Sequence, residues 1–170
     1  MQPDQAKFLL EHYGEVCCRE QGVTTRVIGA MPDGRGDYTP DPKSMKALDL
    51  AWHIASSECW FLEGVIKGTF PTGGEPNRPA ELDSAARIVE WYEARIGPLW
   101  DQLRELDAAK LVQSIDFYGM FSLPAVNYIS LMSRHSIHHR GQLSAYLRPM
   151  GGKVPGIYGP SADEPIQPPK

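Results

Sequence analysis

The sequence has few cysteines, no long apolar run and no excess of positive charge. Cysteine accounts for 3 of the 170 residues, and Cys17 and Cys18 are adjacent, so we expect no disulfide framework and a reducing, cytoplasmic location. No segment approaches the roughly 20 consecutive apolar residues that a membrane-spanning helix needs. The first residues also lack the basic and apolar regions of a signal peptide. The formal net charge of −4 argues against nucleic acid as a partner, because phosphate binding needs a basic face. We therefore expect neither a membrane nor a nucleic acid as a partner.

The composition is that of an ordinary globular protein. Hydrophobic residues make up 42% of the chain and charged residues 22%. This length suits one domain with a full-sized core, so we predict a single domain over residues 1–170.

Apolar residues recur at helical spacing in four segments, which are residues 4–28, 44–67, 83–106 and 122–148. Ser44 and Ser122 are the predicted N-caps of the second and fourth segments. Long connections rich in Gly and Pro separate the first three, at residues 29–42 and 69–79. Residues 114–121 are aromatic and β-branched and predict a short β-hairpin, and residues 151–170 predict an extended tail. The pattern predicts an all-α four-helix bundle.

Two histidines share one face of the fourth predicted helix. His135 and His139 are four residues apart, so they stack one turn above the other on a mostly apolar stripe. A buried imidazole needs a partner, and two interpretations stay open. Each ring could bond to a hydroxyl or a backbone carbonyl as a core residue, or both could ligate one metal ion.

His53 favours the metal interpretation, because it lies on the edge of the apolar stripe of the second predicted helix. Two imidazoles from one helix and one from a facing helix would give three nitrogen ligands and leave a position open for water or substrate. The alternative for these residues is ordinary packing between helices. Three imidazoles suit zinc, nickel, cobalt or iron.

Three further residues are candidates for the surroundings of this site. Asp49 lies one turn before His53 and could accept a hydrogen bond from its second ring nitrogen; the alternative is a solvated carboxylate. Tyr128 and Gln142 lie near the face of His135 and His139 and could orient a substrate or a ligand; their alternative is packing. No catalytic residue is identified.

Four stretches of the sequence match a known family of proteins. They are Y-T-P-D-P-K-S-M at residues 38–45, L-A-W-H-I-A-S-S-E-C-W-F-L at residues 50–62, H-S-I-H-H-R-G-Q-L followed by Y-L-R-P-M-G at residues 135–151, and V-P-G-I-Y-G-P-S at residues 154–161. In these stretches the chain resembles the DinB-like (DNA-damage-inducible) family of metal-binding four-helix-bundle proteins. The resemblance implies a homodimer and a divalent metal, usually nickel or zinc. Carried over position by position, the ligands are His53, His135 and His139.

Two functions follow from these features. In the first, the protein is a metal-dependent enzyme that activates a low-molecular-weight thiol or water, for S-transfer or hydrolysis of a small-molecule substrate. The resemblance supports a thiol, because some members of the family use small thiols. In the second, the protein is a non-catalytic, dimeric metal-binding scaffold in a stress response.

Overall fold

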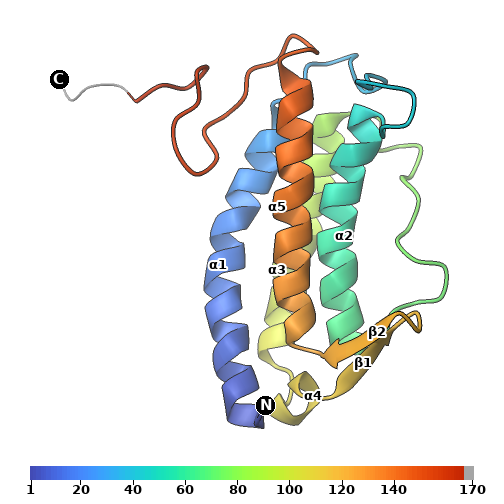
Figure 1. Cartoon of the computed structure of the whole chain (residues 1–170), viewed down its shortest axis with the longest axis vertical. Helices are drawn as coiled ribbons and strands as arrows, with labels where there is room; N and C mark the ends of the chain where they lie inside the picture. Colours follow the sequence, from blue (N-terminus) through green and yellow to red (C-terminus); the bar gives the residue numbers. More distant parts are fainter. Residues whose placement is uncertain (167–170) are drawn as a thin grey trace.

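A computed structural model describes residues 1–166 and shows four long helices packed side by side, with a short helix and a β-hairpin at one end (Figure 1). The elements are α1 (Pro3–Gly29), α2 (Ala47–Lys67), α3 (Ala85–Arg104), α4 (Ala108–Leu111), β1 (Ser114–Phe117), β2 (Phe121–Pro124) and α5 (Asn127–Leu147). The predicted all-α bundle with long connections and a short hairpin is confirmed. The end of the predicted tail, residues 167–170, lies outside the described residues.

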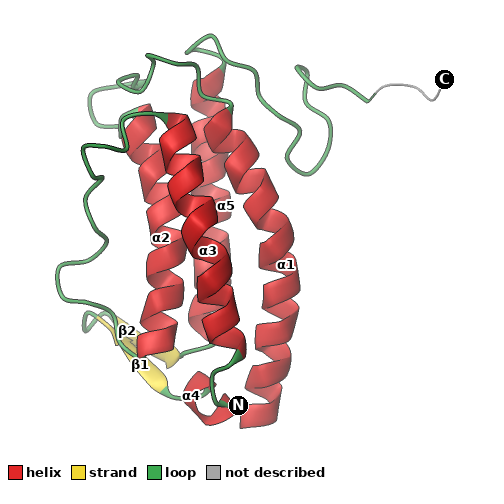
Figure 2. Cartoon of the chain, turned by 180° about the vertical axis from the view of Figure 1, so that it is seen from behind, coloured by secondary structure: helices red, strands yellow, loops and turns green. Residues whose placement is uncertain are grey.

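The direction of the helices places α2 beside α5. In Figure 1, α1 and α5 run upward, whereas α2 and α3 both run downward. The two parallel helices are joined by residues 68–84, which return along the outer side of α2 (Figures 1 and 2). We call this segment the crossover. Helix α2 contacts both α3 and α5, and α1 lies diagonally across the bundle from α2. The helices that carry the candidate histidines are therefore antiparallel neighbours.

The predicted cap of the second helix is wrong. Helix α2 begins at Ala47 because the hydroxyl and the backbone N–H of Ser44 both bond to Asp41 within the preceding loop. The predicted end is confirmed, since the helix ends at Lys67 and Gly68 follows in the left-handed conformation at φ 73°.

The predicted cap of the fourth helix is also wrong, because the hairpin is longer than expected. Ser122 and Pro124 belong to β2, and α5 begins only at Asn127. The two strands pair in antiparallel register from Ser114–Pro124 to Phe117–Phe121. Tyr118 and Gly119 form the turn with φ values of 56° and 71°, as a type I′ turn requires.

The four long helices meet at a buried carboxylate, Glu58 of α2. Its oxygens accept hydrogen bonds from Thr24 of α1 (3.2 Å), Tyr92 of α3 and Ser136 of α5. Burial raises the pKa of the Glu58 carboxyl, while the bonds from Ser136 and Tyr92 and the charge of Arg140 oppose that rise. One hydroxyl from each neighbouring helix thus satisfies a polar group in the middle of an apolar core.

Arg140 of α5 is buried beside this carboxylate, with 1% of its surface exposed. Its guanidinium donates to the Glu20 backbone oxygen (2.8 Å), to the Glu20 carboxylate and to the Thr24 hydroxyl (3.3 Å). It also donates to the Tyr158 hydroxyl (2.7 Å), which comes from the C-terminal tail. The tail is further held by ion pairs of Arg26 with Glu164 (2.7 Å) and of Arg148 with Asp163 (2.9 Å), so it lies along α1 and α5.

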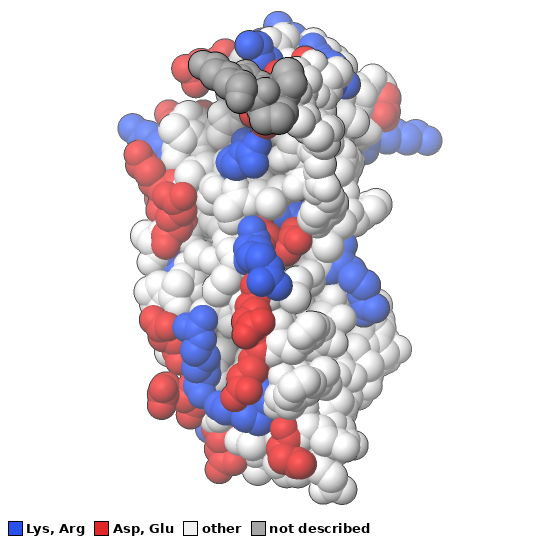
Figure 3. All heavy atoms as spheres, turned by 90° about the vertical axis from the view of Figure 1, so that its left-hand side faces the viewer, with Lys and Arg blue, Asp and Glu red and all other residues white. Residues whose placement is uncertain are grey.

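The outer face of α1 carries charges of both signs. Acidic and basic side chains are interspersed there and form no stripe of one sign (Figure 3). Among the helices of residues 1–166, none is both long enough and apolar enough to span a bilayer.

Candidate metal centre

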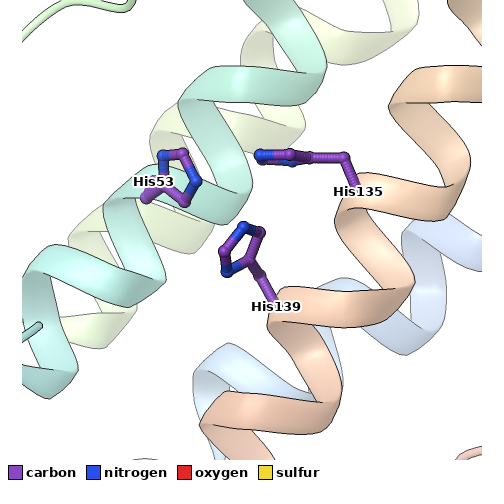
Figure 4. A group of neighbouring side chains, drawn as sticks. All are labelled: His53, His135 and His139. Carbon is purple, nitrogen blue, oxygen red and sulfur yellow. The ribbon is translucent and has the colours of Figure 1, made fainter. Parts of the chain in front are cut away.

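Three histidines from two neighbouring helices point into one space. His53 comes from α2, and His135 and His139 come from successive turns of α5 (Figure 4). Their ring centroids are 4.4–4.8 Å apart, and one potential ligand nitrogen from each ring lies within 4.8 Å of the other two. All three side chains are half-buried. The fold therefore brings together the three residues selected from the sequence. Small rotations of the side chains would move the three nitrogens close enough to bind a single ion.

The outer nitrogen of His53 is fixed by a carboxylate. Its Nδ1 atom lies 2.6 Å from Oε2 of Glu75, and the other carboxylate oxygen of Glu75 contacts the Ser56 hydroxyl. An ionised carboxylate only accepts hydrogen bonds, so the His53 Nδ1 atom is the donor. Nε2 of His53 is then left with its lone pair.

The outer nitrogens of the other two rings have neutral partners. His139 Nδ1 lies 3.1 Å from the Gln142 side-chain oxygen, which can only accept. His135 Nδ1 lies 3.3 Å from the Ser57 hydroxyl. That hydroxyl donates to the Ile54 carbonyl oxygen (3.2 Å) and offers its lone pairs to His135.

In all three rings, the Nδ1 atom thus faces a group that can accept a hydrogen bond. In the Nδ1–H tautomer that these groups favour, each Nε2 atom keeps a lone pair. Metal-ligating histidines almost always have such an acceptor behind them, because it fixes the ring and raises its basicity. Three imidazoles supported in this way fit a divalent ion such as zinc or nickel.

The protonation state of the rings also suits a metal. Burial, together with the charges of His139, His53 and His138, lowers the pKa of His135 to about 4. Burial lowers the pKa of His139 as well, although its bond to Gln142 opposes that change. These two rings are therefore neutral at pH 7, which is the form that binds a metal.

Two of the predicted surrounding residues lie elsewhere. Asp49 does not contact His53; it forms an ion pair with Arg78 (2.9 Å), because the crossover brings Arg78 to the start of α2. Tyr128 donates its hydroxyl to the Ile115 backbone oxygen (2.8 Å) and packs at the hairpin end of the bundle. Gln142 contacts the ring of His139, and its role in orienting that ring stays a prediction.

Sequence reasoning missed the role of two supporting residues. Glu75 lies in the crossover, where no helical periodicity relates its position to that of His53. Ser57 is four residues after His53 on α2, but its hydroxyl contacts His135 of the neighbouring helix α5. Glu58, five residues after His53 on the same helix, faces the bundle interior.

The lowered pKa of His135 predicts how the stability of the metal-free protein depends on pH. Below its ordinary pKa of 6.5 the unfolded ring binds a proton, whereas the folded ring binds one only near pH 4. The free energy of unfolding should therefore fall as the pH drops from about 6.5 to 4, by less than about 1.4 kcal/mol per pH unit, because the ring is partly exposed to solvent screening.

Urea unfolding of the metal-free protein between pH 4 and 7 measures this slope. We expect His135→Gln to make it shallower, and His138→Gln, which changes an exposed ring that makes the last-ranked contribution to the shift, to change it less. An unaltered slope in His135→Gln would contradict the assignment.

The fold and the site define a class of protein: a four-helix bundle with a histidine triad between two adjacent helices. The sequence matches the DinB family over residues 4–169, and the chain belongs to that family. It is 39% identical over 157 residues to the uncharacterized protein YrdA of Bacillus subtilis (strain 168), with 91% of each chain covered.

Solved structures agree with this fold. The DinB-like protein YjoA of Bacillus subtilis superposes with a TM-score of 0.65 at 22% identity, covering 85% of this chain and 93% of that one. A DinB-like protein from Bacillus cereus ATCC 10987 gives a TM-score of 0.70 at 24% identity, covering 87% of this chain and 97% of that one.

Proposed function

We propose that this protein binds one divalent metal ion through His53, His135 and His139 and is a metal-dependent enzyme that activates a small thiol or water. The observation that carries the proposal is the convergence of three rings whose outer nitrogens each face a group that can accept a hydrogen bond. Neutral rings at His135 and His139 add to it. Zinc and nickel are the ions that we favour, and cobalt and iron also suit three imidazoles.

Catalytic zinc sites typically have three protein ligands, whereas structural zinc sites have four. Three histidines therefore fit a catalytic site. A divalent ion held in this way lowers the pKa of a thiol or water that occupies a remaining position. The chain's own residues hold the three rings in place through Glu75, Ser57 and Gln142. The side chain of His53 is 20% exposed, which gives small molecules access to this edge of the site.

The reaction class is nucleophilic transfer. With a thiol, the sulfur forms a bond to an electrophilic carbon, the bond from that carbon to its leaving group breaks with its electron pair, and the thiol proton passes to solvent. With water, the oxygen takes the place of the sulfur and the outcome is hydrolysis. Both reactions need only a nucleophile and an electrophilic small molecule.

Elemental analysis of protein purified without an affinity tag tests the first half of the proposal. We expect about one divalent ion per chain. The second half is tested by mixing the metal-loaded protein with a low-molecular-weight thiol and a chromogenic electrophile. Turnover above the uncatalysed rate should disappear after chelation and return when metal is added.

Other results would separate the alternatives. Metal that raises the melting temperature without any turnover would favour the non-catalytic scaffold, and a sizing experiment with and without chelator would then test whether the metal supports a homodimer. Protein without bound metal, together with no binding of added zinc or nickel, would overturn the proposal.

A further inference from the structure

Glu75 is the one charged acceptor among the groups that support the triad. The acceptor behind His135 is a hydroxyl and that behind His139 is an amide, whereas His53 donates to a carboxylate at 2.6 Å. Hydrogen bonds to ionised groups are roughly twice as strong as those between neutral groups. The support of His53 is therefore chemically different from that of the other two rings.

Glu75 stands behind the triad and not within it. The group of side chains that converges on a common point consists of the three histidines, and Glu75 contacts the far nitrogen of His53. Its second oxygen contacts the hydroxyl of Ser56, which is 1% exposed, so both oxygens of the carboxylate are engaged. This geometry makes Glu75 a positioning residue and not a fourth ligand.

The crossover holds Glu75 in place independently of His53. The Trp52 indole N–H donates to the Pro76 carbonyl oxygen (2.9 Å) immediately after Glu75. Two residues further on, the Arg78 guanidinium bonds to Asp49 (2.9 Å) and to the Leu82 carbonyl oxygen (2.9 Å). The carboxylate is thus delivered to His53 by a segment that is fastened to α2 at neighbouring positions.

We infer that Glu75 positions His53 for metal binding and that its bond couples the order of the crossover to the occupancy of the site. The inference rests on the proposed function. A bound cation polarises the His53 ring and strengthens the Nδ1–H bond to the Glu75 carboxylate, while the carboxylate offsets part of the positive charge of the ion. Coupling of this kind is reciprocal, so a metal that binds more tightly with Glu75 in place also holds Glu75 and its segment more firmly.

Zinc affinity, measured by competition with a chromophoric chelator, is the first test. We expect Glu75→Gln to bind zinc about 10-fold more weakly and Glu75→Ala about 10- to 100-fold more weakly than wild type. Asp49→Asn is the matched control, because it removes a nearby negative charge, keeps an oxygen that can accept from Arg78, and changes a side chain that is paired with Arg78 and not with His53. Its zinc affinity should stay within about 3-fold of wild type.

Two further measurements separate positioning from a general loss of structure. Nitrogen-15 NMR of the metal-free protein should show His53 as the Nδ1–H tautomer in wild type and in Asp49→Asn, and a mixture of tautomers in Glu75→Ala. Hydrogen exchange of residues 71–80 should slow when zinc binds to wild type or to Asp49→Asn, and should not slow in Glu75→Ala.

The outcomes that overturn the inference differ from those that overturn the proposed function. Wild-type protein that binds no zinc would overturn the proposed function. If wild type binds zinc and Glu75→Ala binds it equally tightly, only the role of Glu75 is wrong. If Asp49→Asn loses as much affinity as Glu75→Ala, the crossover acts as a whole and positioning by Glu75 is likewise wrong.

Discussion

Replacing His139 with alanine should weaken metal binding by more than about 100-fold while the bundle stays folded. The change removes one of three nitrogens that converge between α2 and α5 and leaves two, and loss of a ligand costs more than the 10- to 100-fold expected for its supporting partner. The side chain is only half-buried, so helical circular dichroism should be retained. Metal content by elemental analysis and zinc affinity by chelator competition measure the effect.

His138 provides the matched control for this experiment. It is adjacent to His139 on α5 and its ring lies 4.8 Å from that of His139, but it is exposed and does not belong to the converging group. We expect His138→Ala to keep the metal content and the thiol-transfer rate of wild type, whereas His139→Ala loses both. Equal metal content in the two variants would exclude the triad as the binding site.

Replacing Glu58 with alanine should destabilise the protein by about 3–5 kcal/mol. The substitution leaves the hydroxyls of Thr24, Tyr92 and Ser136 without their shared acceptor in the core. It also removes one of the two negative charges near the buried Arg140, which then has only Glu20. Urea unfolding followed by circular dichroism gives the change in the free energy of unfolding. Glu58→Gln, which keeps the shape and one acceptor oxygen, should cost less.

Glu63 on the same helix shows what a partly exposed carboxylate at the surface contributes. It forms ion pairs with Arg95 (2.9 Å) and Lys67 (3.2 Å) at the surface, and such pairs are worth about 0–1 kcal/mol. We therefore expect Glu63→Ala to cost less than 1 kcal/mol. A similar loss in Glu63→Ala and Glu58→Ala would mean that the buried cluster contributes no more than a surface ion pair.

Those parts of the fold that depend on helical periodicity could be predicted from the sequence. The spacing of His135 and His139 gave their common face, and the apolar stripe of the second helix gave the inward edge on which His53 lies. The hydroxyl of Ser44 was a misleading signal, because a nearby aspartate in the loop competes with the helix for it. Local patterns therefore located the helices well and their first residues less well.

Long-range partners could not be predicted in this way. Asp49 is the nearest carboxylate to His53 along the helix, yet it forms an ion pair with Arg78. The carboxylate that contacts His53 is that of Glu75. Arg78 and Glu75 both arrive on an irregular segment, and their positions depend on how that segment folds against α2. Nothing near Arg140 in the sequence indicates Glu20 as its partner either.

The histidines and the carboxylate that supports one of them come from different parts of the chain. The four long helices supply the core and the three histidines, while the crossover, residues 68–84, contributes the Glu75 carboxylate behind His53 from outside the bundle. Surface connections tolerate changes of length and sequence at little thermodynamic cost. A substitution in this connector would therefore change the group that backs the His53 ring and leave the helical scaffold as it is.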